Sequence, residues 1–85
     1  MNTIVWKPKA VKQLAKIKEM AMRQRIYTEI QVLTEFPQCH GVRRLANHAF
    51  GYRLRVGDFR VFFDFDGEIR IVSIEEVKKR DERTH

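Results

Sequence analysis

The sequence contains almost no cysteine: Cys39 is the only one among 85 residues. A single thiol cannot form a disulfide within the chain, which excludes the disulfide frameworks of small secreted domains and favours a reducing cytoplasm. Long apolar runs are missing as well. Only a short apolar run precedes Lys7 and Lys9, so we expect neither a signal peptide nor a membrane-spanning segment.

Acidic residues are scarce relative to basic ones. The chain has 17 Lys and Arg against 11 Asp and Glu, which gives a net charge of +6. Such an excess favours polyanionic partners, meaning RNA, DNA or an acidic protein. Internal repeats and linkers are also missing, and an apolar share of 44% is typical of a chain that folds. We predict a single domain over residues 1–85.

The N-terminal half predicts one short strand followed by helices. Residues 2–6 contain the β-branched and aromatic side chains of a strand, and Pro8 stands where a strand must stop and a helix can begin. Apolar residues then recur at helical spacing over residues 8–19 and again over residues 22–36. We predict two antiparallel helices with a break near residues 18–21. Because no glycine or proline marks that break, one long bent helix is the alternative.

The C-terminal half predicts three strands, at residues 52–56, 59–65 and 68–74. They are separated by the pairs Gly57-Asp58 and Asp66-Gly67, which suit two-residue turns of type II′ and type I′ respectively. The connection before them has no clean periodicity and holds at most a short irregular strand. The predicted fold is therefore α+β. A small, mostly antiparallel sheet, made of the N-terminal strand and the C-terminal three-stranded meander, packs against the N-terminal two-helix hairpin.

Two-residue turns fix which residues face each other across neighbouring strands. Across the first turn Arg55 faces Arg60 and Arg53 faces Phe62; across the second Arg60 faces Ser73 and Val61 faces Val72. Counting by twos then sorts the apolar side chains onto one face, which can pack on the helices: Tyr52, Leu54, Val56, Phe59, Val61, Phe63, Val72 and Ile74. The other face collects Arg53, Arg55 and Arg60.

Three arginines on one sheet face indicate an anion site. Arg55 opposite Arg60 is unfavourable because like charges across a strand pair repel, and a bound phosphate would remove that repulsion. Phe62 on the same face offers a ring on which a base could stack, so the face outlines a surface for single-stranded RNA. The alternative is a solvated sheet face whose charge is relieved by Asp64 or Glu75.

The other titratable residues suggest no metal site. His40 and His48 lie in the connection without the spacing of a zinc site, and we assign neither a catalytic role. The acidic residues around Asp66 lack the calcium-loop pattern. A candidate general acid or base is His85, whose basic tail also carries Lys79, Arg80 and Arg83.

The stretch from Gly51 to Phe63, GYRLRVGDFRVFF, resembles the core hairpin of toxins of the RelE/ParE superfamily. The opening WKPKA, the helix pair that ends in Phe36-Pro37, the RRL before the hairpin and the closing VKKRD are similar too. The resemblance covers essentially the whole chain. It implies a RelE-like toxin of a bacterial type II toxin-antitoxin system, with the RelE-like fold, held inactive by a cognate antitoxin.

Most RelE-like toxins cleave mRNA on the ribosome, without a metal or other cofactor, by attack of a ribose 2′-hydroxyl on the adjacent phosphate. The resemblance therefore implies an mRNA endonuclease whose partners are the ribosome, mRNA and the antitoxin, with operator DNA bound only through the antitoxin complex. It implies phosphate binding by Arg60 and Arg80 and proton transfer by His85. The RNA-binding residues are then Arg53, Arg55, Phe62, Lys79 and Arg83.

Two other functions stay open. A ParE-like toxin has the same fold but inhibits DNA gyrase by binding it. A plain nucleic-acid-binding module without catalytic activity would follow from the positive charge alone.

Overall fold

The computed structural model describes residues 1–80 of the chain and has the predicted α+β class. Its elements are β1 (Thr3–Trp6), α1 (Pro8–Ala15), α2 (Met20–Ile30), the 3₁₀ helix η1 (Gln31–Glu35), β2 (Val42–Arg44), β3 (Tyr52–Val56), β4 (Phe59–Asp66) and β5 (Ile71–Lys79). Among these described residues, no helix is long and apolar enough to cross a membrane.

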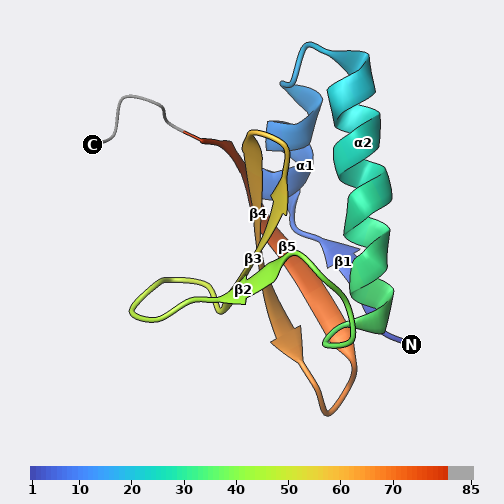
Figure 1. Cartoon of the computed structure of the whole chain (residues 1–85), viewed down its shortest axis with the longest axis vertical. Coiled ribbons are helices and arrows are strands. Elements are labelled where there is room, and N and C mark those ends of the chain that lie inside the picture. The colour runs from blue at the N-terminus through green and yellow to red at the C-terminus, as the bar shows by residue number, and fades with distance from the viewer. Residues whose placement is uncertain (81–85) are drawn as a thin grey trace.

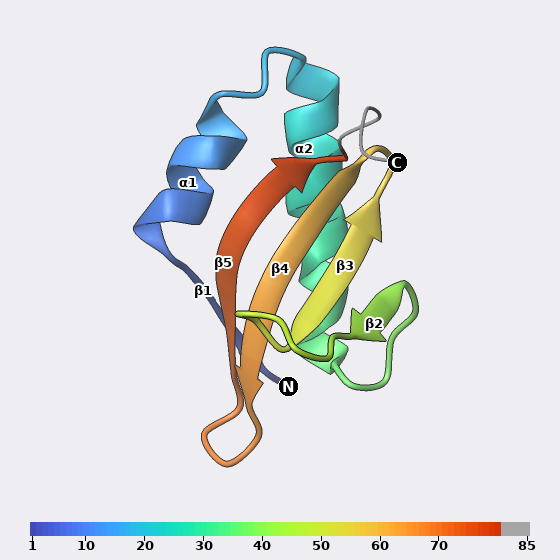
Figure 2. The same ribbon diagram turned by 90° about the vertical axis from the view of Figure 1, so that its left-hand side faces the viewer.

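The strands form one five-stranded sheet in the order β1-β5-β4-β3-β2. β1 runs parallel to β5 and the other neighbours are antiparallel, which confirms the mostly antiparallel sheet. Both helices cover one face of the sheet, the inner face, while the connection between β2 and β3 projects from the other (Figure 1). Figure 2 looks onto this second face, which we call the outer face.

α1 and α2 are separate helices, which decides against one long bent helix. α1 begins at Pro8 as predicted but ends at Ala15, earlier than the expected residue 19. In the connection that follows, the side chain of Arg23 donates a hydrogen bond to the carbonyl oxygen of Ile17. This bond joins the connection to the start of the next helix.

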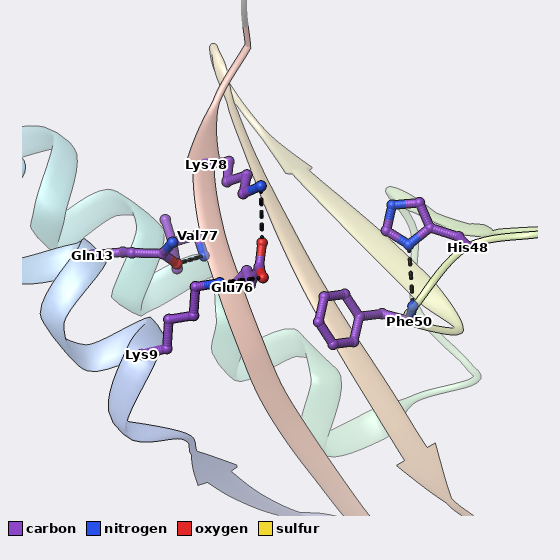
Figure 3. Close-up of polar contacts among 7 residues, drawn as sticks. All are labelled: Lys9, Gln13, His48, Phe50, Glu76, Val77 and Lys78. Carbon is purple, nitrogen blue, oxygen red and sulfur yellow. Dashed lines mark hydrogen bonds and ion pairs between the residues drawn. The ribbon is translucent and has the colours of Figure 1, made fainter.

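Side chains fasten the N-terminal elements to the rest of the fold. Gln13 of α1 accepts a hydrogen bond from the backbone N–H of Val77 in β5 (2.7 Å; Figure 3). Asn2 is buried, and its side-chain amide donates to the carbonyl oxygens of Leu33 (3.1 Å) and Phe36 (2.7 Å). These bonds satisfy polar groups that would otherwise be buried without partners.

The core lies between the helices and the inner face of the sheet. Apolar residues with no exposed surface form its centre. On the strands they are Val56, Val61, Phe63, Val72 and Ile74, and on the helices Ala10, Ile26, Ile30 and Leu33. Phe36 closes one end of this core, with its ring edge-on to three others, those of Tyr52, Phe63 and Phe65. The apolar face predicted by counting along the strands is confirmed, because each of its members belongs to the core or packs against it.

The first hairpin has the predicted register, but the second does not. Arg55 pairs with Arg60 and Arg53 with Phe62, and Gly57 has the positive φ of 56° that the first position of a type II′ turn requires. The second connection spans residues 67–70 instead of Asp66-Gly67. The carboxylate of Asp66 accepts a hydrogen bond from the backbone N–H two residues on (3.0 Å), which builds a wider loop than a type I′ turn.

A bulge in β5 shifts the register further. Phe62 pairs with Glu76 whereas Phe63 pairs with Ile74, so Glu75 is an extra residue on β5. Because of this extra residue, both Ile74 and Val77 face the core, although their spacing of three would place them on opposite faces of a regular strand. Arg60 consequently pairs with Lys78, not with Ser73 as predicted.

Candidate nucleic-acid interface

Arginines from successive strands gather on the outer face of the sheet. Arg43 of β2 is the Cα partner of Arg53 in β3, and Arg55 of β3 is the partner of Arg60 in β4. Paired residues share a face, and so do residues two apart on a strand. Arg80 follows β5, and its backbone N–H donates to the carbonyl oxygen of Asp58 in the turn between β3 and β4 (2.6 Å). We call this set of residues the arginine face: Arg43, Arg53, Arg55, Arg60 and Arg80.

The members of the arginine face lie close enough to repel one another. Burial lowers the pKa of Arg53, and the positive charges of the other members lower it further. The Nε of Arg53 is buried and has no hydrogen-bond partner. Within residues 1–80, none of these arginines forms an ion pair with a carboxylate. Such a cluster is unfavourable by itself, and an anion with several acceptor oxygens would stabilise it.

Glu76 and Asp64 of the outer face already have partners other than the arginines. Glu76 forms ion pairs with Lys9 (2.8 Å) and Lys78 (3.2 Å), as Figure 3 shows. The hydrogen bond from Lys9 holds the pKa of Glu76 below its ordinary value, although burial acts in the opposite direction. Asp64 accepts a hydrogen bond from the backbone N–H of Gly51 (2.7 Å). The alternative in which Asp64 or Glu75 neutralises the arginines finds no support among the ion pairs of the described residues.

Phe62 lies on the outer face as expected, but its ring is covered. Only 8% of its surface is exposed, because the imidazole of His48 stacks on it with ring centroids 5.0 Å apart and an interplanar angle of 13°. Phe50 covers it from another side at 6.3 Å. Phe62 is therefore not the open stacking platform that we predicted. His48, to which we assigned no role, is the exposed ring at this position.

The basic residue that the end of β5 places on the outer face is not the one we predicted. Lys79 pairs with Phe59, an inner-face residue, and lines a shallow hollow between β5 and α1 together with Ile17. Lys78 instead pairs with Arg60 on the outer face. The bulge at Glu75 is the physical reason, since one extra residue exchanges the faces of everything that follows it. Lys79 is thus turned away from the arginine face, whereas Lys78 lies beside that face and forms an ion pair with Glu76 (3.2 Å).

Three predicted residues lie at or beyond the end of β5. Arg80 is exposed, and its charge acts on Arg53. Arg83 and His85 lie outside the described residues. Over residues 1–80, no group of three or more His, Cys, Asp and Glu side chains could hold a metal ion.

Sequence reasoning missed Arg43, Lys78 and His48. Arg43 carried a signal, because a basic pair in the connection can extend an arginine surface if the connection contains a strand. Lys78 could be placed only with the bulge known, and nothing in the sequence brings His48 onto Phe62.

Comparisons with known proteins agree with this architecture. The model of the family described as ParE toxin of type II toxin-antitoxin system, parDE, matches residues 4–84. No curated protein sequence matches the chain. Solved structures are similar to it, among them the RelBE2 toxin-antitoxin complex from Mycobacterium tuberculosis, with 22% identity and a TM-score of 0.76 over 93% of this chain and 98% of the other.

Two further structures have the same fold. The isolated RelE toxin of E. coli is 15% identical, with a TM-score of 0.79 over 96% of this chain and 87% of that one. The archaeal RelE-RelB complex from Pyrococcus horikoshii is 22% identical, with a TM-score of 0.75 over 98% of both chains. Since the family match extends over nearly the whole sequence, the chain belongs to the ParE toxin family and is a RelE/ParE-superfamily toxin of a type II toxin-antitoxin system.

Proposed function

We propose that this toxin is an endoribonuclease that cuts mRNA on the ribosome and so stops translation in the cytoplasm. The observation that carries the proposal is the arginine face, whose members have no carboxylate partner within residues 1–80. An RNA phosphate bound there would accept paired hydrogen bonds from the guanidinium groups, and its charge would end their mutual repulsion.

The proposed reaction takes its nucleophile from the RNA itself. The 2′-oxygen loses its proton and attacks the adjacent phosphorus, while the bond from phosphorus to the 5′-oxygen breaks and that oxygen takes up a proton. The products are a 2′,3′-cyclic phosphate and a 5′-hydroxyl. Negative charge grows on the non-bridging oxygens of the phosphorane, so donors that point at those oxygens lower the barrier.

Arg60 is the best-placed residue for stabilising that charge. It is partly buried, and it has Arg55 as its partner on one side and Lys78 on the other. We assign Arg60 and Arg80 to the phosphorane oxygens. Arg53 and Arg55, one strand further from β5, are assigned to positioning the RNA.

Proton transfer is assigned to His85 on the strength of the superfamily resemblance alone, because His85 lies outside the described residues. Its test is the pH dependence of cleavage. If His85 transfers a proton, His85→Gln lowers the maximal rate at every pH and removes one limb of the pH-rate profile. An unchanged profile would exclude it.

Primer extension on mRNA under translation tests the proposed cleavage. The wild-type toxin is expected to produce new RNA ends within codons, and Arg60→Ala to lower the rate by about 100-fold or more. A matched control is Arg70→Asn, which removes one positive charge from the loop between β4 and β5, where Arg70 has a φ of 55° that asparagine tolerates. Uncut message with the wild-type protein contradicts the proposal.

A second candidate function is inhibition of DNA gyrase, which the match to the ParE family favours. The two functions differ in the first effect that induction of the toxin has on cells. An RNA-cleaving toxin stops protein synthesis at once, whereas a gyrase inhibitor causes filamentation and DNA damage first. Pulse labelling of new protein beside microscopy of the same culture distinguishes them.

We also propose that a cognate antitoxin binds this chain, as RelB accompanies RelE in the Pyrococcus horikoshii complex. A groove between α1 and α2 is lined by apolar side chains that include Val11, Leu14 and Tyr27, of which Val11 is 49% and Tyr27 is 55% exposed. Surfaces of this kind mark contacts with a partner. Co-expression with the neighbouring reading frame is expected to abolish toxicity, and Tyr27→Glu to weaken co-purification of the two proteins. Toxicity that the neighbour leaves unchanged argues against it as the antitoxin.

A further inference from the structure

An aromatic stack stands on the outer face beside the arginines. The imidazole of His48 lies nearly parallel to the ring of Phe62, and Phe50 flanks both, 5.9 Å from His48. Phe62 is buried whereas His48 is exposed. One face of the imidazole is covered by Phe62, so a further flat group could stack only on the opposite face.

The loop that carries His48 is held in place. The backbone N–H of Leu45 donates to the carbonyl oxygen of Gly51 (2.8 Å), which closes the loop at its base. The N–H of Gly51 donates to Asp64 of β4 (2.7 Å), which ties the loop to the outer face. A group held in its binding position before the ligand arrives loses little conformational entropy on binding.

A hydrogen bond also fixes the orientation and the tautomer of the imidazole. Nδ1 of His48 accepts from the backbone N–H of Phe50 (3.1 Å; Figure 3), so the neutral ring carries its proton on Nε2. Nδ1 is therefore engaged within the loop and is not free to take a proton from a substrate. The features that remain for a ligand are the flat face of the ring and the Nε2–H donor.

Phosphate-binding groups lie next to this ring. Arg53 in β3 is the Cα partner of Phe62 in β4, and Arg60 is two residues from Phe62 on the same face of β4. In single-stranded RNA each base is attached to a backbone with phosphates on both sides. An aromatic ring beside a cationic groove is the arrangement by which proteins hold unpaired nucleotides.

We propose that His48 is the platform on which one unpaired base of the RNA stacks, while Arg53 and Arg60 hold the neighbouring phosphate. The proposal rests on the proposed function, because it takes RNA to be the ligand of the arginine face. His48 acts here as a positioning residue: it places the phosphate against Arg60 and takes no part in proton transfer. Phe62 has the supporting role of fixing the imidazole plane.

A short RNA with 2-aminopurine at one position tests the proposal directly. Its sugars carry 2′-O-methyl groups, so it cannot be cleaved, and stacking of the fluorescent base quenches its emission. The wild-type toxin is expected to bind with quenching, and His48→Ala to raise the Kd by about 10-fold or more and to abolish the quenching. His48→Phe keeps a flat ring and is expected to retain both. His40→Ala, at an exposed position in the same connection, is the matched control and is expected to behave as wild type.

Cleavage of ribosome-bound mRNA gives a second readout. A base platform is expected to act mainly on KM, so His48→Ala raises KM several-fold more than it lowers kcat, and His48→Phe restores KM. A group that transfers protons would instead lose kcat in both variants, which overturns the proposal. Binding and quenching by His48→Ala equal to wild type, with circular dichroism unchanged, overturns it as well.

The failure of this inference can be told apart from failure of the proposed function. If the wild type cuts mRNA and His48→Ala cuts it equally well, only the base platform is wrong. If the wild type neither binds the RNA probe nor cuts mRNA, the endoribonuclease proposal fails, and the platform fails with it.

Discussion

Replacing Arg53 by methionine is expected to stabilise the fold while weakening RNA binding. Arg53 sits among four other arginines whose charges lower its pKa, and its buried Nε has no hydrogen-bond partner. Methionine retains a stem of similar length that can keep the packing on the sheet. It removes both the repulsion and the unsatisfied donor.

The magnitude is set by those two contributions. A buried polar group without a partner costs about 1–3 kcal/mol, and only part of that applies because the rest of the Arg53 side chain reaches solvent. We therefore expect the free energy of unfolding to rise by about 1 kcal/mol, which corresponds to about 4–8 °C in Tm for a domain of this size. RNA binding is expected to lose one phosphate contact, so the slope of log K against log salt concentration becomes shallower by about 0.7.

Urea denaturation at low ionic strength, with and without sulfate, measures the effect on stability. Sulfate offers acceptor oxygens to the guanidinium groups of the arginine face. It is therefore expected to stabilise the wild type more than Arg53→Met and to narrow the difference between their free energies of unfolding. The control is Arg44→Met, which also removes one positive charge. Arg44 pairs with Tyr52, which packs against the core, so Arg44 does not belong to the arginine face. If Arg53→Met is no more stable than wild type at low salt, or if sulfate acts equally on both, the reasoning on arginine repulsion is refuted.

Three further changes test other parts of the structure. Because the pKa of Glu76 is lowered in the folded state, its ion pair with Lys9 stabilises the fold by about 1 kcal/mol above about pH 5, and this stabilisation is lost as the pH falls through the folded pKa. Glu76→Gln is expected to remove that loss of stability in acid, measured by urea denaturation at several pH values. Parallel pH dependences of the wild type and the variant would contradict this. Phe63→Ala empties a fully buried site and is expected to lower the free energy of unfolding by about 3–5 kcal/mol, so a loss below about 1 kcal/mol in urea denaturation would mean that the core is packed differently. Lys78→Ala is expected to weaken RNA binding and its neighbour Lys79→Ala to leave it unchanged in the same fluorescence titration, because the two side chains lie on opposite faces of β5; equal effects would contradict the register.

The sequence predicted the first hairpin correctly because its turn chemistry and its hydrophobic alternation agree. Gly57 supplies the positive φ of the turn, and residues on both sides of it alternate between apolar and basic. Once that register was known, the shared face of Arg53, Arg55 and Arg60 followed by counting. This part of the candidate site was therefore within reach of the sequence alone.

The predicted register of the second hairpin was wrong for physical reasons that counting residues cannot detect. Asp66-Gly67 has the composition of a type I′ turn, but the Asp66 carboxylate bonds to the backbone of a longer loop, in which Arg70 takes the positive φ. The stack of His48 on Phe62 depends on how the loop before β3 folds back over the sheet, and local residue spacing carries no information on that path. The sequence thus predicted where the arginines point but not what covers the ring beside them.

The bulge in β5 shows how packing on the inner face determines which basic side chains lie on the outer face. Burial of both Ile74 and Val77 stabilises the core by more than the ladder bond lost at one extra residue, because each apolar side chain contributes about 1.5–3 kcal/mol and a hydrogen bond about 1 kcal/mol. The extra residue then turns Lys78 toward Arg60 and Lys79 toward α1. A single-residue change in the core register would exchange those two lysines and alter the charge beside Arg60. Packing on one face of β5 and the placement of positive charge on the other are therefore set by the same residue count.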